Sequence, residues 1–204
     1  MKYLFRKSCR LGLPFALIVL ASSLCPSQSL CSEIPTHLRG DGTVTIHRPI
    51  TGERATFRYR DEKGDYDDHA FDEIAHLFRC RLTSEEHPID PQLIEILDSI
   101  EDHFSADEVR LISAFRSQER NAMMRKKGRR VAKGSLHMEG RAADIEVPGV
   151  SKIALRNFAH SLGQGGVGYY SKRSFVHVDS GEVRAWGFGP AKAGRRTRPA
   201  AAHK

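Results

Sequence analysis

Three residues in the second half of the chain have the types and the spacing of a catalytic metal site. His137 and Asp144 lie seven positions apart with Gly140 between them. This spacing does not place them on one face of a helix, so it predicts a loop that turns at the glycine and enters a strand. His177 lies in the apolar segment Phe175–Asp179, where strand alternation directs it away from the flanking valines. Two imidazoles and one carboxylate are a typical catalytic zinc set, because they leave the fourth coordination position for water.

The predicted strand Ala142–Val147 decides where the carboxylate of Asp144 points. On a strand, Asp144 and Glu146 share one face and Ile145 takes the other. We therefore expect the apolar face to be buried and Asp144 to face a cleft. The alternative concerns His177, because a single histidine in an apolar strand is more often a hydrogen-bonded core residue than a metal ligand.

Motifs spread along the chain resemble a known family. The segment Ser135–Asp144 resembles the S-x-H-x-x-G-x-A-x-D signature of the D-Ala-D-Ala metallopeptidases, whose fold class includes lysostaphin-type enzymes and the Hedgehog signalling domain. The closer similarity is to murein endopeptidases of the YcbK and MepK type, and it extends from Thr43 to about Trp186. The other segments that carry it are Thr51–Glu53, Ser113–Ser117, Gly165–Tyr170 and Phe175–Gly181. The resemblance implies a zinc ion held by His137, Asp144 and His177, and murein peptides as the substrate.

One departure from the related carboxypeptidases concerns the general base. These enzymes place a catalytic glutamate three residues before the last histidine, where this chain has Ser174. Asp179 is the best replacement, because it shares a strand face with His177 about 7 Å along the strand. It could accept a proton from the attacking water or orient a ligand histidine, and both roles stay open. Glu139, beside a predicted turn, is a weaker candidate.

Further residues are expected to contact the substrate. The resemblance implies that Arg116 faces the substrate and stabilises developing negative charge, as a guanidinium near the scissile carbonyl can do. The alternative is a surface arginine beside a helix start. Ser135 belongs to the signature, and the aromatic Tyr169, Tyr170 and Trp186 are expected to bind the substrate along the cleft wall. Each aromatic residue is also explained as part of the core or its rim.

The resulting hypothesis is zinc-assisted hydrolysis of amide bonds in peptidoglycan peptides, with cross-link cleavage during cell-wall remodelling as the first choice. A D,D- or L,D-carboxypeptidase is the nearest alternative. A zinc-containing cell-wall binding module without activity is another, and Ser174 in place of the glutamate favours it. Digestion of purified murein with and without a chelator distinguishes a zinc-dependent peptidase from a binding module without activity.

The charge distribution argues against a nucleic-acid partner. The net charge of +7 comes from the two ends of the chain. Residues 1–31 carry four basic and no acidic residues, and residues 191–204 carry five basic and none acidic. The rest holds 23 basic and 25 acidic residues, so it has no excess of positive charge for a phosphate backbone. We expect residues 189–204 to form a basic disordered tail.

The N-terminal residues 1–31 have the features of a signal peptide. Basic residues up to Arg10 precede the apolar run Leu11–Leu24, which is too short for a confident membrane span. We therefore expect export to the periplasm or cell envelope, with membrane contact only if the segment stays uncleaved as an anchor. In an oxidising compartment Cys31 and Cys80 could form a disulfide.

The intervening residues 41–188 are expected to form one metallopeptidase domain. Alternating residues predict a hairpin over Thr43–Arg60, and apolar spacing predicts helices near Phe71–Phe78 and from Pro91 to Phe104. Three strands and two helices follow, and these are a strand over Glu108–Phe115, helices opening at Ser117 and Ser151, and strands over Gly165–Tyr170 and Phe175–Asp179. With Ala142–Val147, this order predicts an α+β fold: a central antiparallel sheet flanked by helices, like that of the Hedgehog and D-Ala-D-Ala peptidase class.

Overall fold

The computed structural model describes residues 39–128 and 131–188. The predicted signal peptide, the basic tail and Cys31 lie outside these residues. Cys80 is buried, and its Sγ lies 3.4 Å from Ser117 Oγ as a hydrogen-bond donor. Across the described ranges, no helix has both the length and the apolar character needed to cross a bilayer.

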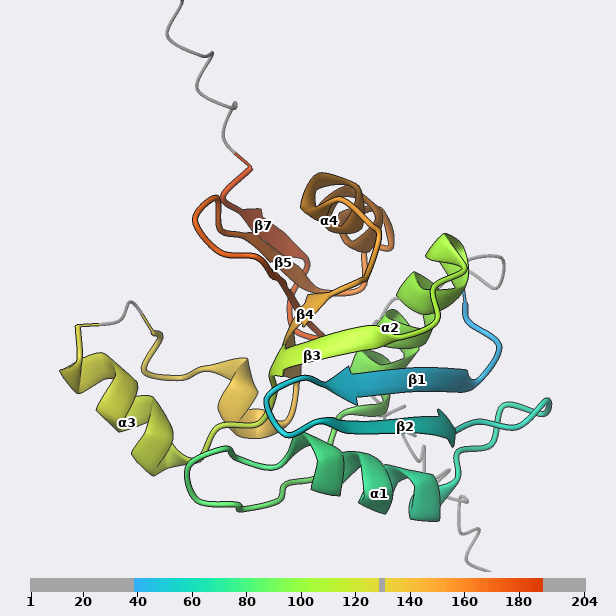
Figure 1. Cartoon of the computed structure of the whole chain (residues 1–204), viewed down its shortest axis with the longest axis horizontal. Coiled ribbons are helices and arrows are strands. Elements are labelled where there is room, and N and C mark those ends of the chain that lie inside the picture. The colour runs from blue at the N-terminus through green and yellow to red at the C-terminus, as the bar shows by residue number, and fades with distance from the viewer. Residues whose placement is uncertain (1–38, 129–130, 189–204) are drawn as a thin grey trace, which may run out of the picture. The chain divides into compact units, whose positions relative to one another are not determined.

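A seven-stranded sheet forms the centre of the fold, with the strand order β2-β1-β3-β4-β6-β5-β7. The strands are β1 (Thr43–Arg48), β2 (Glu53–Arg58), β3 (Val109–Ser113), β4 (Ala142–Glu146), β5 (Gly166–Tyr169), β6 (Val176–Asp179) and β7 (Arg184–Trp186). The helices are α1 (Asp68–Phe78), α2 (Pro91–Phe104), α3 (Gln118–Lys126), the short 3-10 helix η2 (Leu136–Glu139) and α4 (Lys152–Ser161). Figure 1 shows their arrangement.

The α+β class predicted from the sequence is confirmed, but the sheet is mixed rather than antiparallel. β1 pairs with β3 in parallel, and β5 pairs with β7 in parallel. The first parallel pair arises because α1 and α2 connect β2 to β3. This long connection lets β3 enter the sheet beside β1 and run in the same direction as β1. The second involves β7, a three-residue strand too short to give a sequence signal. The four remaining pairings are antiparallel.

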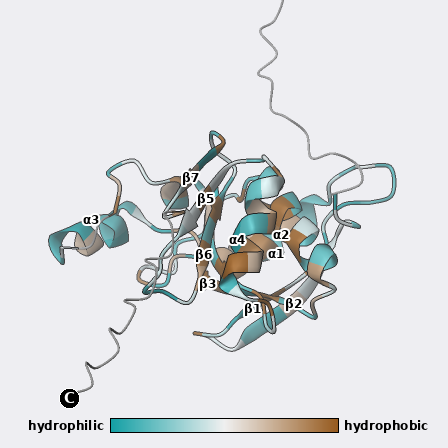
Figure 2. Cartoon of the chain, turned by 90° about the horizontal axis from the view of Figure 1, so that it is seen from above, coloured by the Kyte–Doolittle hydropathy of each residue, from teal (hydrophilic) through white to brown (hydrophobic). Residues whose placement is uncertain are grey.

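Three helices bury their apolar faces against the sheet. α2 contacts β1 and α4, α4 contacts β5 and β6, and α1 contacts β2. Figure 2 shows hydrophobic residues gathered where these helices meet the strands. The predicted helix from Pro91 to Phe104 is confirmed as α2, and its start is stabilised because the Asp90 carboxylate accepts the Gln92 amide and Pro91 occupies the first turn. Its apolar stripe is buried at Leu93, Leu97 and Ile100.

The helix α3 differs from the others because it has no apolar face. Of its nine residues only Asn121 is buried, and Figure 2 shows the helix as largely hydrophilic. The Ser117 side chain caps it by accepting the Arg120 amide at 3.3 Å. The segment that contains α3 lies between β3 and η2, with Arg116 just before α3 and Ser135 just before η2. The segment therefore begins and ends at residues that the sequence analysis expected to contact the substrate.

Truncation of Leu97 tests the position of the core. Leu97→Ala is expected to lower the free energy of unfolding by about 2–5 kcal/mol, because it leaves a cavity under the sheet. The control Leu82→Ala removes the same atoms from a side chain that is 44% exposed, and should change stability by less than about 0.5 kcal/mol. Urea denaturation measures both. Equal losses in the two variants would contradict the assignment of α2 to the core.

Candidate functional site

The pairing of β4 with β6 brings Asp144 and His177 together. In the antiparallel register Asp144 lies directly opposite His177, and His177 Nδ1 is 3.0 Å from Asp144 Oδ1. His137 comes from η2, and its Nε2 lies 3.4 Å from the same oxygen and 3.2 Å from His177 Nδ1. One potential ligand atom from each residue thus lies within 4.8 Å of the others. The structure therefore assembles the three residues that the sequence singled out.

The far nitrogen of each histidine has an acceptor that determines its tautomer. His137 Nδ1 donates to the carbonyl oxygen of Ala114 at 2.8 Å, and His177 Nε2 donates to Asp179 Oδ2 at 3.0 Å. Carbonyl and carboxylate oxygens only accept, so in the neutral form of each ring, which is the form that binds a metal, the opposite nitrogen keeps its lone pair. These lone pairs, on His137 Nε2 and His177 Nδ1, face Asp144. Two neutral imidazole donors and a carboxylate fit a zinc ion.

Burial and charge act in opposite directions on these groups. Burial lowers the pKa of His137, which favours its neutral form. Burial alone would raise the pKa of Asp144, but the two histidines outweigh it and hold that pKa well below its usual range. Burial also disfavours charge on His177, yet hydrogen bonds to Asp144 and Asp179 raise its pKa overall. The site thus combines a buried, ionised carboxylate with two imidazoles, a donor set that suits a metal cation.

Asp179 is buried and its carboxylate is fully occupied. One oxygen, Oδ1, accepts the backbone amides of Gly166 at 3.0 Å and Gly181 at 2.9 Å. The other oxygen, Oδ2, contacts Arg184 Nη2 at 2.9 Å as well as His177 Nε2. The shared strand face of Asp179 and His177 is as predicted. The carboxylate nevertheless meets the nitrogen of His177 that points away from the other ligands.

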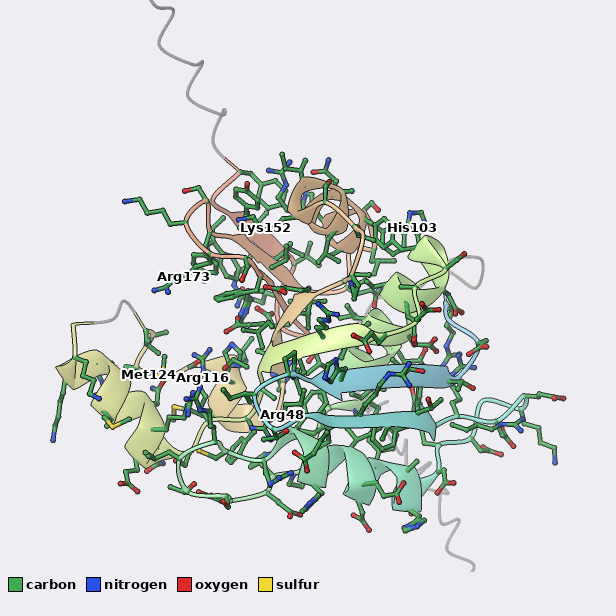
Figure 3. All side chains as sticks on the ribbon, viewed as in Figure 1. Arg48, His103, Arg116, Met124, Lys152 and Arg173 are labelled. Carbon is green, nitrogen blue, oxygen red and sulfur yellow. The ribbon has the colours of Figure 1, made fainter. Side chains whose placement is uncertain are left out.

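Arg116 lies within the donor set rather than at the surface. Its side chain is 9% exposed, its Nη2 donates to Asp144 Oδ2 at 2.8 Å, and the same nitrogen is 3.1 Å from His137 Nε2. Its backbone amide donates to the carbonyl of His137 at 2.9 Å. Figure 3 shows Arg116 at the base of α3, beside the short helix η2. The alternative of a surface arginine is therefore wrong.

Trp186 and Tyr170 form an aromatic wall beside His177. The rings of Trp186 and His177 have centroids 5.1 Å apart, and Trp186 Nε1 donates to Tyr170 Oη at 3.1 Å. Gly168, paired with His177 across the sheet, makes room for the indole, because a Cβ there would come within 2.4 Å of the ring. Two of the three predicted aromatic residues thus reach the site.

The expectation that Tyr169 lines the cleft is wrong. Its ring packs on the other side of β5, with Lys152 Nζ 4.5 Å and Arg156 Cζ 5.0 Å from the ring centroid. The physical reason is strand alternation. Gly168 shares the face of its partner His177, so Tyr169 faces the opposite side, where α4 lies.

The remaining candidates have clear positions. Ser135 is buried and opens η2, where its carbonyl accepts the Met138 amide at 2.7 Å, so it supports the turn that carries His137. Glu139 is 53% exposed and lies 3.7 Å from Arg141 in an ion pair. Sequence reasoning missed Arg184, because nothing in its neighbourhood indicated a partner for a residue on β6.

The tryptophan beside the site offers a direct report of metal binding. Trp186 is the only tryptophan of the chain. Cobalt(II) added to chelator-treated protein should quench its fluorescence and saturate near one equivalent, because the ion absorbs light and is paramagnetic. His177→Ala should abolish the quenching, whereas the control His69→Ala, 82% exposed on α1, should retain it. Equal quenching in both variants would contradict the assigned site.

Comparison with known proteins identifies the family. Residues 40–186 match the family described as peptidoglycan L,D-endopeptidase MepK. The "Probable peptidoglycan L,D-endopeptidase MepK" of Haemophilus influenzae is 37% identical over 145 residues, which are 70% of this chain and 77% of the relative. The "Peptidoglycan L,D-endopeptidase MepK" of Escherichia coli K12 is 34% identical over 144 residues, 70% of this chain and 79% of the relative. No solved structure matches the chain significantly. The resemblance seen in the sequence motifs is confirmed, and the chain belongs to the peptidoglycan L,D-endopeptidase MepK family.

Proposed function

We propose that the chain is a zinc-dependent endopeptidase that cuts peptide cross-links of peptidoglycan at an amide bond between an L and a D centre. One observation carries the proposal: the lone pairs of His137 and His177 and the carboxylate of Asp144 converge, with the far nitrogen of each histidine held by an acceptor. The names of the relatives support peptidoglycan and the L,D bond. Because this substrate lies outside the cytoplasmic membrane, they also support export to the envelope.

The proposed roles follow from the contacts of each side chain. His137, Asp144 and His177 would hold the metal. When bound, a zinc ion supplies Lewis-acid polarisation of the amide carbonyl and lowers the pKa of water. Arg116 brings a buried positive charge to the edge of the donor set, where it can stabilise negative charge on the carbonyl oxygen. Trp186 forms a flat wall against which the substrate peptide can lie.

For Asp179 we favour the orienting role over that of general base. Its oxygens already accept from Gly166, Gly181, Arg184 and His177, and the residue is 1% exposed. A carboxylate that accepts from the far nitrogen of a ligand histidine fixes the ring and increases its basicity. A general base must instead reach the attacking water.

A second candidate function is a zinc-containing binding module without activity. The observation that favours it is Ser174, which replaces the glutamate of the carboxypeptidases and is exposed in the turn before β6. Activity on intact murein separates this candidate from the peptidase.

Murein digestion tests the proposed reaction. The zinc-loaded mature protein should release new peptide termini from purified sacculi, and a chelator should prevent the release, because the reaction needs the metal. Mass spectrometry of the muropeptides identifies the bond that is cut. His137→Ala should be inactive, with His69→Ala as the active control. Unchanged muropeptides with the zinc-loaded protein would favour the binding module.

Asp179→Asn separates the two roles of this carboxylate. If Asp179 orients His177, the variant should bind zinc about 10- to 100-fold more weakly in competition with a chelator. Activity should then recover in large part when zinc is in excess. Glu62→Gln is the control, because it removes the charge of a carboxylate that is 95% exposed and lies beyond the end of β2. Unchanged zinc affinity together with a roughly hundredfold loss of kcat would identify Asp179 as the general base instead.

A further inference from the structure

Tyr170 has a hydroxyl group that is oriented by a neighbour and still free to donate. Trp186 Nε1 donates to Tyr170 Oη at 3.1 Å, and an indole N–H can only donate. The phenolic oxygen is therefore the acceptor of this bond, and its own hydrogen stays available. Among the described residues this hydrogen has no acceptor. Tyr170 is 38% exposed, so the hydroxyl is accessible to a bound substrate.

The surrounding contacts hold this hydroxyl beside the proposed metal ligands. The indole that orients it lies 5.1 Å from the ring of His177 by centroids, and rests against the backbone of β5 at Gly168. On its other side the phenol ring meets Phe175 at a centroid distance of 5.7 Å. The indole of Trp186 thus contacts both Tyr170 Oη and the ring of His177, and Phe175 packs against the phenol ring.

Arg116 approaches the same region from the other side of the site. It follows β3, whereas Tyr170 follows β5, and the two strands are separated in the sheet by β4 and β6. Its Nη2 donates to Asp144 Oδ2 at 2.8 Å and lies 3.1 Å from His137 Nε2. The guanidinium therefore contacts Asp144 and His137, whereas the indole that orients the phenolic O–H packs against His177.

We propose that Tyr170 is a catalytic residue whose O–H donates a hydrogen bond to the carbonyl oxygen of the scissile amide as negative charge develops on it. This inference rests on the proposed peptidase function. Oriented donors aimed at developing charge lower the barrier of amide hydrolysis, because they need no reorganisation during the reaction. The O–H bond stays intact throughout, so Tyr170 transfers no proton and complements Arg116 as a second donor.

A wall residue alone would not need the hydroxyl group, and this difference makes the proposal testable. Tyr170→Phe keeps the ring and removes only the donor. Its neighbour Tyr169 gives a matched control, since Tyr169→Phe removes the same atom on the opposite face of β5. We expect Tyr170→Phe to lower kcat on cross-linked muropeptides about a hundredfold, with KM and zinc content unchanged. Tyr169→Phe should behave as the parent enzyme.

A tetrahedral mimic provides a second readout that does not depend on turnover. A phosphinate analogue of the scissile amide presents the oxygen charge that the hydroxyl is proposed to contact. Its affinity, measured by Trp186 fluorescence, should fall in Tyr170→Phe by a factor similar to the loss of kcat. Trp186→Phe, followed by calorimetry, keeps an aromatic wall but removes the N–H that orients Oη. It should lower kcat in the same direction, and the double variant should lose little more than Tyr170→Phe.

Two results would overturn the inference. Unchanged kcat and phosphinate affinity in Tyr170→Phe would exclude the donor role. A raised KM with unchanged kcat would reduce Tyr170 to a binding surface. In both cases the proposed function stands as long as the parent protein cuts murein in a zinc-dependent manner. A zinc-loaded parent protein that leaves murein intact contradicts the proposed function itself, before any variant is compared.

Discussion

The antiparallel pairing of β4 with β6 is the constraint on which the site depends. The register that sets Asp144 opposite His177 also sets Ala143 opposite Val178, which are buried on the other face. A slip of one residue would turn the two polar side chains into the core and the apolar ones onto the opposite face of the sheet. The apolar packing under the sheet therefore helps to specify the position of Asp144 and His177. The pairing of β4 with β6 therefore places core residues on one face of the sheet and the residues of the candidate site on the other.

The position of His137, the third residue of the candidate metal site, depends on the end of β3. His137 Nδ1 donates to the carbonyl of Ala114, and the Arg116 amide donates to the carbonyl of His137, so two hydrogen bonds fasten η2 to the segment after β3. The chain between these points contains α3, which buries almost nothing. A rigid frame around the ligands is thus combined with a polar excursion that contributes little to the core.

The charges of the site are buried but paired. Arg116 contacts Asp144, and Arg184 contacts Asp179. An unpaired charge at such depth would cost several kcal/mol, so each partner is needed to keep the other ionised. The pairing of Asp179 with Arg184 also explains why this carboxylate is suited to hold a histidine in place. The chain belongs to a peptidase family, and for the reaction of that family we propose the hydroxyl of Tyr170, oriented by Trp186, as a hydrogen-bond donor in addition to Arg116.

Local sequence patterns were sufficient for the family, the three candidate ligands and most elements. The cap and stripe of α2 and the alternation in β4 depend on neighbouring residues only, so they can be read without the fold. The tertiary structure alone decided the parallel pairing of β7 with β5, because a three-residue strand has no pattern of its own. It also decided which tyrosine contacts Trp186 beside His177, since that depends on the register of β5 against β6. The surroundings of Asp179 come from β5, β6 and β7 together, so its contacts with Arg184 and two backbone amides could not be inferred from its position in the chain.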